Sequence, residues 1–308
     1  MKEFDYEKRV MGSEASMSIV ASDRATADAA AIALFDIAEV EEARFSRFRK
    51  ESELSRLNKE RALKVSREFM DALLLGKELY RRSAGAFNPL ADISRFGYDQ
   101  DISVVKGADR TGKDLATYSI DMELVLIDEE AMRVVLQEGQ NLDFGGFIKG
   151  HTAEKMAEAA LDCQGALINL GGDIYARGLD AEGKPFIFIV ENPLDPDADL
   201  SFLATNAGIA TSGSYNRHWK SRGTPFSHIL DSSGIKNPDT QILSATVIAP
   251  TGAESDALAT AALVLGIEAG QKLLEQNGCE YCFIAKDNSL AFSGAFPFIQ
   301  KSESPAYA

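Results

Sequence analysis

The sequence predicts an α+β fold in one compact domain, with mixed sheets flanked by helices. Two observations predict the class. Apolar residues recur at helical spacing in the first half of the 308-residue chain, and short strand-like runs concentrate in the second half. A third observation predicts a single domain, because no internal repeat, low-complexity tract or linker divides the chain. A chain of this length can bury a substantial core.

The composition is that of an acidic globular protein. Hydrophobic residues make up 45% and charged residues 26% of the chain, which argues against wholesale disorder. The 32 basic and 47 acidic residues give a net charge of −15, which argues against nucleic acid or an anionic membrane surface as the main partner. A phosphate-bearing cofactor remains compatible, because an acidic protein can bind it through a divalent metal and backbone amides.

The N-terminal sequence does not predict export. Its first eight residues lack an apolar h-region, a small-residue cleavage site and a lipobox cysteine. No run approaches the roughly 18 apolar residues of a spanning helix, so we expect no membrane span. We expect a cytoplasmic protein; the alternative is an exported one whose signal has been removed. Three cysteines, an odd number, do not form a disulfide framework.

The first elements predicted are a strand and a long helix. Residues 1–10 are expected to be a peripheral tail. Residues 15–21 alternate enough to form a strand, and the alanine-rich residues 24–45 carry apolar side chains at helical spacing. Residues 45–58 follow, dense in charge and with two phenylalanines three positions apart.

A second helix is predicted over residues 66–83. Ser66 is a suitable N-cap, and the segment Gly-Ala-Phe-Asn-Pro at 85–89 is a strong break after the helix. Residues 91–117 are polar and irregular in pattern, and we expect them on the surface.

A hairpin and a third helix follow. Apolar runs at 124–127 and 132–136 flank three acidic residues and predict the hairpin. The helix is predicted to follow the glycines at 145–150, and Gly165 stands where the C′ residue of this helix would be. The predicted apolar face of that helix consists of Ala153, Met156, Ala157, Ala160 and Leu161.

The second half is richer in strands. Helices are predicted at 254–265 and 269–276, and residues 297–308 are expected to be a second tail. The predicted strands are 167–170, 186–190, 202–205, 245–248 and 280–285.

The most informative motif is the glycine turn at 141–150, Asn-Leu-Asp-Phe-Gly-Gly-Phe-Ile-Lys-Gly, followed by Gly-Gly-Asp at 171–173. Glycines, a lysine and a helix start can present amides, a dipole and a cation to an anionic group. The turn nearly matches a P-loop, but His151 stands in the place of the lysine and no buried strand precedes it, so we reject that interpretation. Taken alone, a tight structural connection explains the turn equally well.

Asp256 and Thr260 lie four residues apart on one predicted helix, so both side chains can face one point. A carboxylate and a hydroxyl together suit a hard cation such as magnesium. Taken alone, however, an acid near a helix start more often complements the helix dipole.

Two further motifs have a functional and a structural interpretation. His228 precedes Asp231 by three residues, which suits a general base with an orienting partner, and a buried structural histidine is as good an explanation. Cys279 and Cys282 have the spacing of a redox pair. They lie in an alternating strand-like run, which favours structural thiols.

In this order, the motifs resemble the FAD:protein FMN transferase (ApbE) family. The similarity extends from Met11 to about Phe296, nearly the whole chain. Seven blocks carry the resemblance: Phe45-Ser-Arg-Phe48 with 52–58, Gly85-Ala-Phe-Asn-Pro89, Asp143-Phe-Gly-Gly-Phe-Ile-Lys-Gly150, Gly171-Gly-Asp173, Thr211-Ser-Gly-Ser-Tyr215, Ser227-His-Ile-Leu-Asp231 and Asp256-Ala-Leu-Ala-Thr260.

The resemblance implies a T-fold-related α+β domain with an FAD cleft. It also implies magnesium-dependent transfer of FMN from FAD to a threonine hydroxyl of an acceptor protein, with release of AMP. It places the metal on Asp256 and Thr260 with a backbone oxygen near Gly146 to Ile148. Asp256 and His228 would be catalytic, with His228 deprotonating the threonine. The implied FAD contacts are Met11, Phe48, Ala86, Phe87, Asn88, Asp143, Lys149 and Leu230.

The chain departs from the family pattern at five positions, namely Ser13, Asn88, His151, Ser232 and Ala259. Ala259 stands where some members carry a second acid, so one carboxylate remains in the implied metal cluster. Two alternative functions stay open. The first is an FAD pyrophosphatase with water as the acceptor, and the second is a non-catalytic flavin-binding protein.

Overall fold

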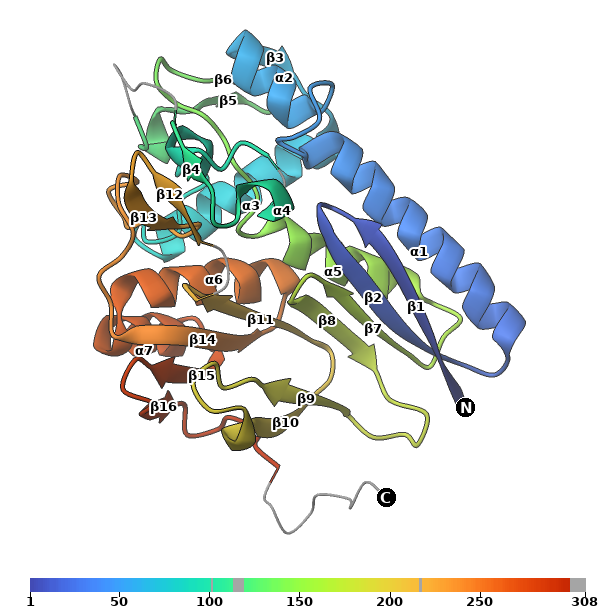
Figure 1. Ribbon diagram of the computed structural model, residues 1–308. Helices are drawn as coiled ribbons and strands as arrows, with labels where there is room; N and C mark the ends of the chain where they lie inside the picture. The colour runs from blue at the N-terminus through green and yellow to red at the C-terminus, as the bar shows by residue number, and fades with distance from the viewer. Residues whose placement is uncertain (101, 113–118, 216–217, 300–308) are drawn as a thin grey trace.

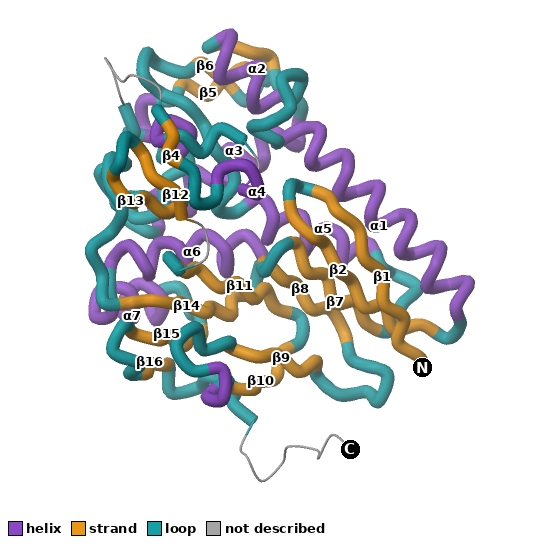
Figure 2. Tube along the Cα trace, viewed as in Figure 1, coloured by secondary structure: helices purple, strands orange, loops and turns teal. Residues whose placement is uncertain are grey.

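The computed structural model describes residues 1–100, 102–112, 119–215 and 218–299. Its centre is an eight-stranded antiparallel sheet in the order β1-β2-β7-β8-β11-β14-β15-β16 (Figures 1 and 2). The strands are β1 (Lys2–Val10), β2 (Ser13–Ala21), β7 (Gly165–Leu170), β8 (Asp173–Gly178), β11 (Ala207–Gly213), β14 (Ile242–Ala249), β15 (Glu280–Ala285) and β16 (Leu290–Phe292).

Both faces of the inner strands of this sheet are largely buried. On β2, Met17 and Ile19 pack into one cluster of apolar side chains, while Val20 packs into another on the opposite face. On β14, Val247 and Ile248 divide between the two faces in the same way. Successive side chains of a strand point to opposite faces, so two layers must cover this sheet.

Helices form the layer on one face (Figure 1). The Asp23 carboxylate caps the longest of them by accepting a hydrogen bond from the Thr26 N–H at 3.0 Å. The helices of this layer are α1 (Arg24–Phe45), α5 (Ile148–Ala159), α6 (Gly252–Leu265) and α7 (Ile267–Gln276).

A two-stranded sheet, β9 (Phe186–Val190) and β10 (Leu200–Ala204), covers part of the other face. Its inward side chains, Phe186 and Phe188 among them, pack with Val20 of β2. The outward side chains alternate with these and are exposed, as the pattern of β9 shows. The outer edge of β10 is closed by the chain itself, because the Ile299 N–H donates to the Ser201 carbonyl oxygen at 2.8 Å.

A smaller unit stands above one end of the sheet (Figure 1). The Ser66 hydroxyl caps one of its helices, as predicted, by accepting from the Phe69 N–H at 3.2 Å. The elements of this unit are α2 (Glu53–Glu60), α3 (Arg67–Arg82), α4 (Ile102–Val105), a sheet in the order β3-β6-β5 (Ala62–Lys64, Arg133–Val135, Leu126–Asp128) and a sheet in the order β13-β12-β4 (Thr224–Ser227, His218–Ser221, Asp109–Arg110).

The prediction of an irregular surface segment at 91–117 is wrong for much of its described part. Ile93, Tyr98 and Val105 are buried in a small cluster with Trp219 and Leu230. Polar residues between these positions obscure the apolar spacing in the sequence, and their partners lie more than a hundred residues away. Residues 101 and 113–117 lie outside the described part.

Most predicted helices and strands are confirmed to within a few residues, and three further local predictions are wrong. Residues 2–10 form the edge strand β1 instead of a tail. Leu161, placed on the buried face of α5, is exposed because the helix ends at Ala159. Gly165 is the first residue of β7 instead of a helix cap. Of the predicted C-terminal tail, residues 300–308 lie outside the described part.

Within the described part of the chain, no helix is long and apolar enough to span a membrane.

Candidate active site

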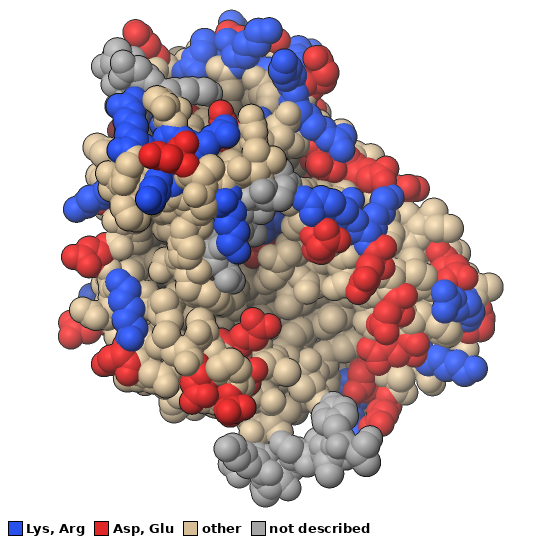
Figure 3. Space-filling model, in the orientation of Figure 1, with Lys and Arg blue, Asp and Glu red and all other residues tan. Residues whose placement is uncertain are grey.

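A cavity of about 530 Å³ lies where the smaller unit meets the central sheet. Figure 3 shows this face of the molecule hollowed, with acidic and basic side chains on the rim. All thirteen residues predicted for the site line this one cavity: Met11, Phe48, Ala86, Phe87, Asn88, Asp143, Gly146, Ile148, Lys149, His228, Leu230, Asp256 and Thr260. The structure therefore brings together residues that are up to 249 positions apart in the sequence, from Met11 to Thr260.

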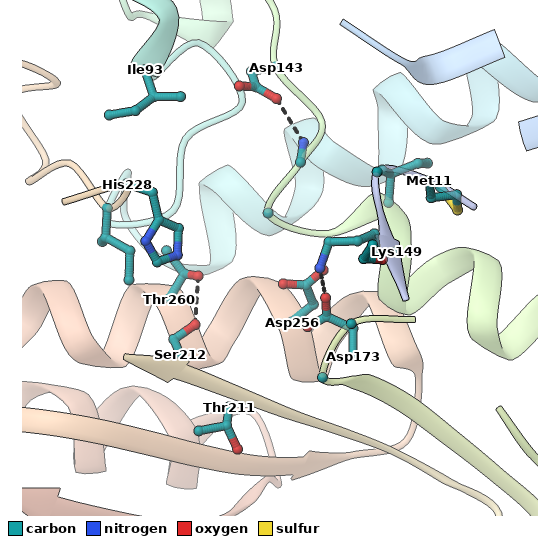
Figure 4. Close-up of a pocket in the computed structure, with 18 of the residues that line it drawn as sticks. Met11, Ile93, Asp143, Lys149, Asp173, Thr211, Ser212, His228, Asp256 and Thr260 are labelled. Carbon is teal, nitrogen blue, oxygen red and sulfur yellow. Dashed lines mark hydrogen bonds and ion pairs between the residues drawn. The ribbon is translucent and has the colours of Figure 1, made fainter. Parts of the chain in front are cut away.

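Helix α6 supplies two oxygen-bearing side chains to the cavity. Asp256 and Thr260 are one turn apart and point into the cavity, as Figure 4 shows. Thr251 caps this helix by accepting a hydrogen bond from the Glu254 N–H at 3.2 Å. The cap is therefore a separate residue, and Asp256, only 6% exposed, lies one turn further along the helix. The Ser212 and Thr260 hydroxyl oxygens lie 2.9 Å apart.

The glycine turn reaches Asp256 because α5 and α6 touch backbone to backbone. A Cβ on Gly150 would lie 2.0 Å from the Gly252 carbonyl oxygen and 3.1 Å from the Asp256 Cβ. Neither position can carry a side chain, since contacts under 3.0 Å are not found for real Cβ atoms. The N-cap residue of α5, Phe147, makes no side-chain hydrogen bond to the helix, and the Ile148 N–H donates to the Phe144 carbonyl oxygen at 3.0 Å.

Lys149, in the first turn of α5, forms an ion pair with Asp173 at the start of β8. The two side chains are 15% and 9% exposed, and both line the cavity (Figure 4). Gly171 and Gly172 precede Asp173 with φ of +71° and +102°, which only glycine adopts without strain, so the chain turns sharply into β8. Asp173 was not predicted as a site residue; its place after two glycines was the available signal.

Another wall of the cavity is aromatic and carries an arginine. The Arg47 guanidinium lies 4.8 Å from the ring centre of Phe48 and 4.5 Å from that of Tyr98. It also donates to the Asp143 carboxylate at 2.5 Å. Asp143 in turn accepts from the Gly145 N–H at 2.9 Å, which fixes the start of the glycine turn. Sequence reasoning missed Arg47, although it lies inside a motif that was used.

The Met11 side chain reaches the cavity from a tight hairpin turn. β1 and β2 are joined by Met11 and Gly12 alone, and both have positive φ, at +54° and +71°. Two consecutive positive φ values are typical of the type I′ turn that fits the twist of antiparallel strands.

The segment after α3 is held by its own side chains. The Asn88 amide oxygen accepts from the Leu90 N–H at 2.9 Å, and its nitrogen donates to the Ile120 carbonyl oxygen at 2.8 Å. Ala86 and Phe87 are buried, and the Phe87 ring meets Phe147 edge-on with centroids 5.9 Å apart.

His228 lies on a loop fixed by Asn237, whose side-chain amide donates to the Ser227 and Ile229 carbonyl oxygens at 2.9 and 2.6 Å. In Figure 4 the His228 ring points toward Thr260. Asp231, the predicted orienting partner of His228, accepts hydrogen bonds from the N–H and hydroxyl of Ser233.

The oxygen atoms at the α5–α6 contact suit a hard divalent cation. Asp256 and Asp173 supply carboxylates, Thr260 a hydroxyl and the glycine turn backbone carbonyls. The Ile148 carbonyl oxygen already accepts from the Thr152 hydroxyl at 2.7 Å, in addition to its place in the hydrogen-bond ladder of α5. No group of three or more His, Cys, Asp or Glu side chains suited to a metal occurs among the described residues.

The cysteine pair is structural. Cys279 and Cys282 are buried and carry no disulfide, and burial raises the pKa of each thiol to about 12. Neither residue lines the cavity.

The chain is similar to known proteins over most of its length. The model of the ApbE family matches residues 11–283. A protein named FAD:protein FMN transferase from Klebsiella pneumoniae (strain 342) is 25% identical over 293 residues, covering 91% of this chain and 83% of that protein. One of the same name from Haemophilus influenzae is 26% identical, covering 85% and 80%.

Solved structures share the fold. The ApbE protein from Thermotoga maritima superposes with a TM-score of 0.83 at 21% identity, covering 95% of this chain and 97% of that one. The flavin transferase ApbE from Vibrio cholerae gives 0.81 at 21% identity, covering 97% and 99%. The predicted α+β fold class is thereby confirmed.

Proposed function

This chain belongs to the ApbE family, and from that premise we propose that it transfers FMN from FAD to a threonine hydroxyl of an acceptor protein and releases AMP. One observation carries the proposal: a single cavity gathers an aromatic wall, a largely buried lysine and a cluster of side-chain oxygen atoms. FAD contains both an aromatic ring system and a diphosphate, so its two chemical parts match the two sides of the cavity.

The aromatic wall would hold a flat ring of FAD. Phe48, whose ring is exposed, offers a ring face, and Arg47 between it and the buried Tyr98 is fixed by Asp143. Lys149 and the N-terminal amides of α5 would face the diphosphate, since both favour anions. Met11, Leu230 and the Ala86–Asn88 segment would complete the contact surface.

We place a magnesium ion on Asp256 and Thr260, with a backbone oxygen from Gly146 or Ile148. When bound, the ion would neutralise charge that develops on the diphosphate oxygens during transfer. Oxygen-only donors on rigid elements support this placement.

His228 is our candidate for the general base. It would take the proton from the threonine Oγ, which then forms a bond to the phosphorus of the FMN moiety. The bond between that phosphorus and the bridging oxygen breaks, and the AMP phosphate leaves with the electron pair. The position of His228 on the cavity wall near Thr260 supports the role.

The test is an incubation of the protein with FAD, Mg²⁺ and a threonine-bearing acceptor. We expect the acceptor to gain the mass of FMN, with AMP in equal amount. Free FMN and AMP without a labelled acceptor would instead identify water as the acceptor. Intact FAD that is bound but never cleaved would identify a flavin-binding protein and overturn the proposal.

A further inference from the structure

The Lys149–Asp173 ion pair involves one residue, Asp173, that is not among the predicted metal ligands. Lys149 is the cavity's proposed contact for the diphosphate, yet in this structure its ammonium is engaged by a carboxylate. Both side chains are mostly buried, so the pair is shielded from the solvent that weakens surface ion pairs.

The second acid near this pair is Asp256. In Figure 4, Asp256 from α6 and Asp173 from β8 both point toward the end of the Lys149 side chain. The other acid of α6, Glu254, is instead paired with Arg82 at 2.5 Å and does not line the cavity. Asp173 is therefore the second carboxylate that the fold presents to the same part of the cavity as Asp256.

The part of the cavity around Lys149, Asp173 and Asp256 carries an excess of negative charge. Two carboxylates and one ammonium leave a net charge of −1, and the diphosphate of FAD would add about −2. Burial makes such an excess unfavourable unless a cation joins it. Magnesium is commonly held by one or two carboxylates together with substrate phosphates.

Building on the proposed function, we propose that Asp173 is a second carboxylate ligand of the divalent cation. The Lys149 ammonium is paired with this carboxylate as long as no cation is bound. When the cation occupies Asp173, Lys149 is released to the diphosphate. Cation and FAD would then strengthen each other's binding, because each favours the same exchange of partners.

The proposal gives Asp173→Asn two effects of opposite sign. The variant loses a carboxylate ligand, so its affinity for the cation falls. It also removes the Asp173 carboxylate from the Lys149 ammonium without any cation, so the affinity for FAD in the absence of metal rises. A residue that only holds Lys149 in position would behave differently, because its loss would weaken FAD binding and leave the cation affinity unchanged.

Binding measurements on the whole protein separate these outcomes. Mn²⁺ alone, followed by the loss of the free-ion signal in electron paramagnetic resonance, reports the cation site. FAD alone in EDTA, followed by flavin fluorescence, reports the lysine. We expect Asp173→Asn to bind Mn²⁺ at least about 10-fold more weakly and FAD several-fold more tightly.

The matched control for the Mn²⁺ titration is Glu42→Gln, which removes a cavity carboxylate of α1 that is paired with Arg49 at 2.9 Å. We expect this variant to keep its Mn²⁺ affinity, and Asp173→Glu to recover part of the lost affinity. Unchanged Mn²⁺ binding in a folded Asp173→Asn protein would overturn the inference. Neither titration needs turnover, so failure of flavin transfer in the earlier test is a separate result.

Discussion

The hydroxyl oxygens of Ser212 and Thr260 lie 2.9 Å apart, and both residues line the cavity. A hydroxyl that binds a cation through a lone pair must donate its proton elsewhere. Ser212, on β11, is placed to accept that proton, so it would orient the Thr260 oxygen toward the metal.

The first prediction follows from this pair. Ser212→Ala should weaken Mg²⁺ activation by about 10-fold or more, because outer partners of metal ligands tune their orientation. Turnover measured across a magnesium titration gives the activation constant. Thr211→Val is the control, since the Thr211 hydroxyl is bonded to Thr246 at 2.9 Å and not to a proposed metal ligand. An unchanged activation constant in Ser212→Ala would show that Thr260 needs no such partner.

Asp256→Asn should lower kcat by at least about 100-fold, the loss typical when a group that stabilises developing charge is removed. The Kd for FAD should change far less, because the metal acts mainly in the transition state. Single-turnover rates and FAD titrations separate the two quantities. Glu254→Gln, on the same helix but paired with Arg82, should retain full turnover. Equal losses of turnover and FAD binding in Asp256→Asn would indicate a structural acid.

Gly150→Ala should destabilise the fold by about 1–3 kcal/mol, because the added Cβ would force the backbones of α5 and α6 apart. Urea unfolding measures the loss. Gly294→Ala is the control, since a Cβ there meets nothing within 4 Å. If the two variants had the same midpoint, the close approach of the helices would not be required.

His151 predicts a dependence of stability on pH. Burial lowers its pKa below the ordinary value of 6.5, so the unfolded chain binds this proton more readily than the folded protein does. The free energy of unfolding therefore falls as pH drops from about 6.5 toward the folded-state pKa. His151→Phe should lose less stability between about pH 7 and pH 5. Denaturation at several pH values checks this, and parallel curves for the two proteins would contradict it.

Helices and strands with a clear pattern in adjacent residues were predicted from the sequence. Elements that form only by pairing with distant parts of the chain were not predicted. Residues 24–45 form α1 as predicted, because the helical spacing of apolar residues and the capping residue Asp23 both lie within one continuous segment. Strand β8 was missed, since Asp173–Gly178 has little apolar alternation and becomes a strand only between β7 and β11.

The same division holds within the cavity. The family resemblance supplied Asp256 and Lys149, whose motifs are continuous in sequence. Asp173 and Tyr98 acquire their positions from partners elsewhere in the chain, namely Lys149 for the first and Arg47 for the second. Only the folded arrangement shows those pairs.

The contact between Gly150 and Gly252 joins segments about a hundred residues apart, so the ligand site exists only after both halves of the chain have docked. Substrate or metal then binds the folded state alone and shifts the folding equilibrium toward it. A ligand at 100 times its Kd would add about 2.7 kcal/mol to the free energy of unfolding. The midpoint of thermal unfolding should therefore rise with ligand concentration, so it reports the fraction of ligand sites that are occupied.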